Sequence, residues 1–140
     1  MRIVWKHDPL DFHKDAPLAH FASVAAQQQG KFWEFHDKVF ANQTNLKRDA
    51  FVKYARELGL DLKKFEEDLY SPGPKATVDA DIAEAKALAV TGTPAFFVNG
   101  RYLSGAKPFE EFAEVINAEL TRLKLPVPSA PPPARAAAGG

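Results

Sequence analysis

No cysteine occurs among the 140 residues of the chain. This absence excludes a disulfide framework, a thiolate nucleophile and every zinc or iron–sulfur site that is built on cysteine. The fold must therefore be held by a hydrophobic core. A chain of this length can bury roughly two-thirds of the surface that its unfolded form exposes, which is enough for one core. We expect one domain over residues 1–125.

The end of the chain has a different composition. Residues 126–140 are almost entirely Pro, Ala, Gly and Ser, with one arginine. Such a segment lacks the apolar groups that would offset the entropy of ordering. We expect a flexible tail there.

Charge and hydropathy exclude several classes of partner. Lysine and arginine number 18, as do aspartate and glutamate, so no net field favours nucleic acid or an acidic membrane surface. The longest apolar runs, such as residues 95–98, are too short to cross a bilayer. Charged residues also interrupt the start of the chain before a signal-peptide apolar region can form. We expect no membrane span and no export signal within the chain.

The middle of the chain has a helical apolar period. Between residues 14 and 70 this period predicts at least four helical segments. They centre on residues 16–29, 32–40, 51–58 and 62–69. Gly30 and Gly59 are predicted stops and Asp61 is a plausible N-cap. Residues 71–74 predict a break, and a further helix follows with an apolar stripe of Val78, Ile82, Ala85 and Leu88.

Strands are predicted at both ends of this helical block. Residues 2–7 alternate as a strand does and end at Pro9, which cannot donate to a ladder. The apolar run 95–98 is typical of a strand covered on both faces, and Asn99-Gly100 predicts a hairpin turn into a strand at 101–104. A terminal helix to Leu123 follows Pro108. This order predicts an α/β layered fold with helices on a small mixed sheet.

Four pieces of sequence then stand in a consistent order: residues 2–7, 30–37, 90–100 and 104–106. They read RIVWKH, GKFWEFHD, VTGTPAFFVNG and SGA. Together they resemble the DsbA-like branch of the thioredoxin superfamily over about residues 2–123. The resemblance implies a thioredoxin-like α/β fold with a helical insertion, and the activity of a thiol–disulfide oxidoreductase.

The resemblance also implies an element that this chain does not show. In the family, a further strand and a helix starting with Cys-x-x-Cys precede the strand that resembles residues 2–7. A helix N-terminus stabilises a thiolate, which explains the place of that motif. Without it we expect the chain to be inactive in disulfide exchange. The preceding strand would lie between residues 2–7 and 95–98, so we expect an incomplete central sheet.

Two further expectations follow from the missing strand. Unpaired strand edges favour self-association, or receipt of a strand in trans. Relatives in the family often have valine where Met1 stands, so we also expect the chain to be a truncated reading of a longer exported protein. The family implies a periplasmic or other extracytoplasmic compartment, whereas the chain itself shows no signal peptide.

The candidate binding site is Gly92, Thr93 and Pro94. By residue type alone, Pro94 is a strand-starting trans proline, because only about one X-Pro bond in twenty is cis in folded proteins. The resemblance instead implies a cis-proline loop at which the backbone of Thr93 pairs with an extended peptide or protein substrate. Gly92 suits a tight turn or a close backbone approach.

No catalytic residue, metal or other cofactor is predicted. Hydroxyl side chains lack an obvious base beside them in sequence, although a serine–histidine pair is an alternative. The four histidines are His7, His13, His20 and His36, and their spacing does not put two on one helical face. The spacing of Phe32, Trp33 and Phe35 favours core packing over a ligand-stacking box, and the acidic residues at 66–68, 79, 81 and 84 are expected to be solvated.

Three functions remain open at this point. The first is part of a DsbA-like thiol–disulfide oxidoreductase domain. The second is a redox-inactive peptide-binding or scaffold module that uses the groove at Pro94. The third is a glutathione-handling relative, such as the kappa-class transferases and chromene isomerases, which the family resemblance implies share the fold.

Overall fold

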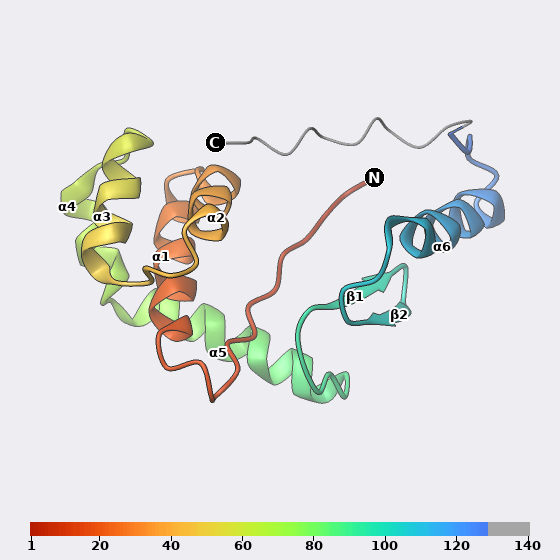
Figure 1. Cartoon of the computed structure of the whole chain (residues 1–140), viewed down its shortest axis with the longest axis horizontal. Helices are drawn as coiled ribbons and strands as arrows, with labels where there is room; N and C mark the ends of the chain where they lie inside the picture. Colours follow the sequence, from red (N-terminus) through yellow and green to blue (C-terminus); the bar gives the residue numbers. More distant parts are fainter. Residues whose placement is uncertain (129–140) are drawn as a thin grey trace. The chain divides into compact units, whose positions relative to one another are not determined.

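A computed structural model describes residues 1–128 of the chain. These residues divide into two compact units, Met1–Thr91 and a second unit that starts at Gly92. The first unit holds five helices, and the described part of the second holds a β-hairpin and one helix (Figure 1). Most of the predicted tail, residues 129–140, lies outside the described residues.

The first unit is built around helix α1 (Ala16–Gln28). Its buried alanines, such as Ala22, Ala25 and Ala26, leave room for close neighbours, and α1 packs against the other four helices of this unit. These helices are α2 (Phe32–Ala41), α3 (Arg48–Glu57), α4 (Leu62–Leu69) and α5 (Pro72–Ala87). The largest buried side chains of the core include Phe35, Phe51, Phe65 and Leu69.

Local signals set the helix boundaries where the sequence predicts them. Gly30 and Gly59 have positive φ angles of 75° and 71° and follow the ends of α1 and α3. The side chain of Asp61 accepts a hydrogen bond from the backbone N–H of Lys64 at 3.0 Å, which confirms it as the N-cap of α4.

The predicted break at residues 71–74 is shorter than expected, because only Tyr70 and Ser71 separate α4 from α5. Helix α5 begins at Pro72, so its first turn includes residues 72–74. The first N–H groups of a helix have no partner within the helix, and proline therefore costs nothing at the first position. The prolines start this helix rather than interrupt it.

The predicted strand at residues 2–7 is wrong. This segment has no regular secondary structure, and among the described residues the only sheet is a two-stranded antiparallel one, not a mixed sheet. A strand exists only when a neighbour receives its backbone hydrogen bonds, and an alternating sequence cannot supply that neighbour. The segment is held instead by side chains, as described below.

The second unit contains β1 (Ala95–Val98), β2 (Arg101–Ser104) and α6 (Phe109–Arg122). Ala95 pairs with Ser104 and Val98 with Arg101, and φ is 49° at Asn99 and 86° at Gly100. This confirms the predicted hairpin and its turn, in which both central residues take positive φ.

The expected cover on both faces of β1 is not present in residues 92–128. Phe96 packs edge-on against Phe112 of α6 at 4.7 Å between ring centroids. Phe97 lies against Tyr102 of β2 and is 42% exposed. Within this unit, α6 supplies one covering layer and the hairpin's two aromatic side chains cover only each other on the opposite face.

Candidate functional site

The predicted site residues lie in the loop that leads into β1. The peptide bond between Thr93 and Pro94 is cis. The carbonyl oxygen of Pro94 accepts a hydrogen bond from the backbone N–H of Gly105 at 2.8 Å, just beyond the pair formed by Ala95 and Ser104. The residue that follows β2 is therefore hydrogen-bonded to the loop that precedes β1.

The backbone before Pro94 is open. Thr93 and Pro94 are exposed and Gly92 is half-buried. Among the described residues, the backbone N–H and C=O of Thr93 have no hydrogen-bond partner. A free backbone group next to a strand can pair with an extended chain.

The backbone conformation at position 92 does not require a glycine. Its φ lies outside the left-handed region, and a Cβ atom there would meet no heavy atom within 4 Å. Thus neither a turn nor packing within the described chain requires glycine at this position. The open space beside Gly92 would accommodate the close approach of a ligand backbone.

A buried carboxylate joins the hairpin to α6. Glu119 is buried, and its oxygens lie 2.8 Å from Arg101 Nε and 2.8 Å from Arg122 Nη2. Asn99 Nδ2 donates to the same carboxylate at 3.3 Å. Hydrogen bonding from Arg122, then from Asn99, and the charges of both arginines lower the pKa of Glu119 below its usual value. The charges that neutralise Glu119 come from both β2 and α6.

A second buried carboxylate anchors the start of the chain to α5. Asp81 Oδ2 accepts the backbone N–H of His7 at 2.9 Å, and Asp81 Oδ1 lies 2.9 Å from Lys6 Nζ. Lys6 Nζ also lies 2.7 Å from Glu84 Oε2. The expectation that Asp81 is solvated is therefore wrong, because its carboxylate is enclosed and neutralised by the N-terminal segment.

Two histidines meet beside Asp81. The Nδ1 atoms of His7 and His20 are 2.8 Å apart, and the His7 residue is only 3% exposed. Burial lowers the pKa of both imidazoles, and that of His20 to about 4. Sequence spacing missed this pair because His7 lies on the extended segment and His20 on α1. One signal was present: Asp81 falls on the same helical face as Val78 and Ala85, where an acidic residue needs a partner.

The aromatic residues of α2 divide between core and surface. Phe35 is fully buried, as predicted, but Trp33 is 45% exposed, so its predicted core packing is wrong. Trp5 of the N-terminal segment packs against α2 instead. Ring-centroid distances from Trp5 are 4.6 Å to His36 and 6.4 Å to Trp33. We call this group the aromatic cluster; its members are Trp5, Phe32, Trp33, His36 and Phe40.

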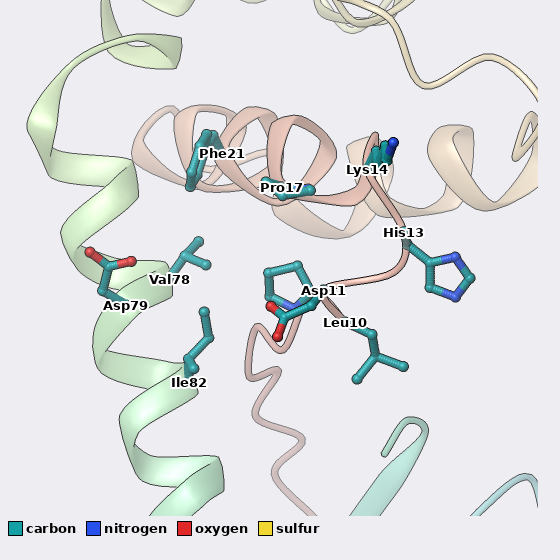
Figure 2. Close-up of a pocket in the computed structure, with 10 residues that line it drawn as sticks. Leu10, Asp11, His13, Lys14, Pro17, Phe21, Val78, Asp79 and Ile82 are labelled. Carbon is teal, nitrogen blue, oxygen red and sulfur yellow. The ribbon is translucent and has the colours of Figure 1, made fainter. Parts of the chain in front are cut away.

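An open hollow of about 380 Å³ lies between residues 9–21 and helix α5 (Figure 2). Val78 and Ile82 of α5 face Pro17 and Phe21 of α1 across it. Asp79 and Lys14 contribute charge at its margin. Its lining is largely apolar, and it lies wholly within the first unit.

Residues 1–128 contain neither a cluster of metal ligands nor a helix that could span a membrane. No group of three or more His, Cys, Asp or Glu side chains in this range is arranged to hold a metal ion. No helix in the same range has the length and apolar character needed to cross a membrane.

Curated relatives are similar to this chain over most of its length. A protein named Na(+)/H(+) antiporter NhaA 3 from Salinispora tropica is 37% identical over 126 residues, which are 89% of this chain and 19% of that protein. Na(+)/H(+) antiporter NhaA from Herminiimonas arsenicoxydans is 42% identical over 118 residues, 84% of this chain and 19% of its own length. The chain thus spans about a fifth of the length of these relatives.

A solved structure and a family model agree on the fold. The structure of a thioredoxin-like oxidoreductase from Silicibacter pomeroyi matches with a TM-score of 0.72 and 25% identity, covering 83% of this chain and 66% of that one. The family model described as "DSBA-like thioredoxin domain" matches residues 3–117, which include the helices of the first unit and the hairpin. The chain belongs to the DSBA-like thioredoxin domain family.

Proposed function

We propose that the chain is a portion of a DsbA-like thiol–disulfide oxidoreductase domain that binds an extended peptide, and that it exchanges no disulfide by itself. Family membership and the likeness to a thioredoxin-like oxidoreductase support the class. The absence of cysteine supports the second half, because the thiolate is the group that attacks a disulfide.

The free backbone of Thr93 is the observation that carries the binding proposal. Thr93 is exposed, and its N–H and C=O have no partners among the described residues, although the residue lies just before Pro94 and the start of β1. An extended peptide would pair with these groups as an added strand, and main-chain hydrogen bonds would supply the affinity. The space beside Gly92 would let the peptide backbone come close.

Peptide titration of the full chain tests this proposal. The probe is a fluorescent eight-residue peptide of alternating valine and threonine, and the control peptide has the same sequence with N-methylated backbone amides. We expect the first to bind and the second to bind at least tenfold more weakly, because methylation removes the donors. Equal affinity of the two peptides would contradict pairing through the backbone.

A matched pair of glycine variants locates the site. Gly92→Ala should weaken binding of the unmethylated peptide, because the added methyl group occupies the space that the ligand backbone needs. Gly73→Ala is the control, because its Cβ would make only ordinary contacts of 3.7 Å in the first turn of α5. An unchanged affinity in Gly92→Ala would place binding elsewhere.

Disulfide exchange needs a separate measurement. We expect the reduction of insulin by dithiothreitol to proceed at the same rate with and without the chain. A reproducible acceleration would contradict the proposed inactivity.

A redox-inactive binding or scaffold module is the second candidate. The observation that favours it is the combination of an open Thr93 backbone with a sequence that holds no cysteine. The similarity to about a fifth of two proteins named as antiporters suggests a module that serves a larger transport protein. Mass spectrometry of the native polypeptide separates the two candidates. Its intact mass is compared with 15.4 kDa for this chain, and its proteolytic peptides are sequenced to find any cysteine. A native polypeptide with Cys-x-x-Cys favours the oxidoreductase, and one without cysteine favours the module.

A further inference from the structure

We propose that His7 and His20 form a proton-sensitive latch that holds the N-terminal segment on the helical unit, and that acid opens the latch before the helices unfold. The segment in question is residues 1–8. Opening would withdraw Trp5 from the aromatic cluster and expose the rings of α2. This proposal concerns the first unit alone and does not depend on the peptide site at Thr93.

The hydrogen bond between the two imidazoles permits only some protonation states. At 2.8 Å between Nδ1 atoms, one ring must donate and the other accept. Two neutral rings satisfy this requirement, and so do one neutral and one protonated ring. Two protonated rings do not, because both Nδ1 atoms then carry hydrogen and both rings are positive. The second proton must therefore separate the rings.

The surroundings of the pair are charged on one side and apolar on the other. Asp81 of α5 faces both rings and favours their protonation, whereas Lys6 of the segment itself opposes it at His7. Phe32 of α2 packs against His7 at 6.0 Å between centroids and brings no charge. Glu84 of α5 acts on this group through its ion pair with Lys6. Burial outweighs the attraction of Asp81 and keeps the resting pair from being doubly charged.

Besides its polar contacts with Asp81 and Glu84 and the packing of Trp5 on α2, the segment has few attachments, and this is why it would open locally. Ile3 and Val4 are 66% and 60% exposed, and residues 1–7 form no strand. The core of the unit is formed by α1–α4 and does not include the segment. Elements with few buried contacts open at lower free energy than the core.

The test uses full-length chain in which Trp33→Phe leaves Trp5 as the sole tryptophan. Between pH 7 and pH 4 we expect the emission of Trp5 to shift to longer wavelength and the amides of residues 3–8 to lose protection from hydrogen exchange. Far-UV circular dichroism should stay constant over that range. Simultaneous loss of the helical signal would overturn the proposal, because the segment would then only follow global unfolding.

Two variants separate the histidines from the carboxylates. His20→Asn places an amide near the position of Nδ1 and does not titrate, so it should abolish the fluorescence change. His13→Asn is the control, because His13 is exposed, and it should titrate like the parent. A transition that persists in His20→Asn would not depend on the pair of imidazoles and would overturn the proposal.

Direct titration of the imidazoles keeps the proposal testable if His20→Asn fails to fold. In ¹⁵N spectra of the parent chain, we expect at least one of His7 and His20 to titrate well below the ordinary value of 6.5. If both titrate at or above 6.5, burial does not oppose protonation of the pair, and the proposal would fail.

Discussion

The backbone N–H of His7 donates a hydrogen bond to Asp81 Oδ2 at 2.9 Å, which joins residues 74 positions apart in sequence. The other carboxylate oxygen, Asp81 Oδ1, accepts a hydrogen bond from Lys6 Nζ at 2.9 Å. A segment whose alternating residues predict a strand is therefore fixed by one helical side chain instead of a sheet neighbour. This relationship makes Asp81 the main polar attachment of the N-terminal segment.

Substitution of Asp81 should destabilise the chain. Asp81→Ala leaves the buried N–H of His7 without an acceptor, and an orphaned buried donor costs about 1–3 kcal/mol. Asp79→Ala is the matched control on the same helix, because Asp79 is exposed and pairs with Lys75 across one turn; it should change stability by less than about 0.5 kcal/mol. Urea unfolding followed by circular dichroism measures both. Equal effects of the two substitutions would show that the Asp81 contact contributes nothing.

The attachment of the hairpin to α6 should depend on pH through Glu119. The folded pKa of Glu119 lies below its ordinary value of 4.5 because Arg122, Asn99 and Arg101 stabilise the carboxylate. Its contribution is therefore fully present above pH 4.5 and is lost as pH falls through the lower folded pKa. We expect the ring contacts of Phe96 with Phe112 to weaken in that range, as seen by NMR.

Glu119→Gln provides the control for this pH dependence. The amide keeps one acceptor oxygen but carries no charge, so the contacts of Phe96 should be weaker at neutral pH and should no longer respond to Glu119 titration. An unchanged acid response in this variant would assign the effect to another carboxylate.

Some features of the fold were accessible from local sequence and others were not. The turn at Asn99-Gly100 and the cap at Asp61 were predicted because each depends on residues within one turn or one helical cap. The strand at residues 2–7 was predicted wrongly, because alternation shows which faces a segment has and not whether a neighbour pairs with it. The sequence wrongly predicts a solvated Asp81, because the partners of this carboxylate are distant in sequence and charge alone does not identify them.

Replacing Gly100 in the hairpin turn should lower the stability of the chain more than replacing Gly92 in the loop before β1. Gly100 has a φ of 86°, and a side chain in the left-handed region costs about 1–2 kcal/mol. Gly100→Ala should therefore destabilise the hairpin. Gly92→Ala should be close to neutral, since neither positive φ nor crowding is present there. Thermal unfolding monitored by the NMR signals of Phe97 and Tyr102 compares the two. Equal destabilisation would mean that backbone conformation does not account for Gly100.

The hairpin should also make the chain self-associate. In residues 92–128, β1 pairs only with β2, so its outer edge has no strand neighbour, and Phe97 on this strand is 42% exposed. Unpaired edges of this kind form sheets between molecules unless charge opposes them. We expect light scattering to detect dimers or larger species at micromolar concentration, and Phe97→Lys to reduce them by placing a charge on the edge strand. Phe12→Lys removes an equally apolar side chain, 75% exposed in the first unit, without touching a strand. A monomeric parent chain would contradict the prediction, and an equal effect of both lysines would assign association to general hydrophobicity instead of the strand edge.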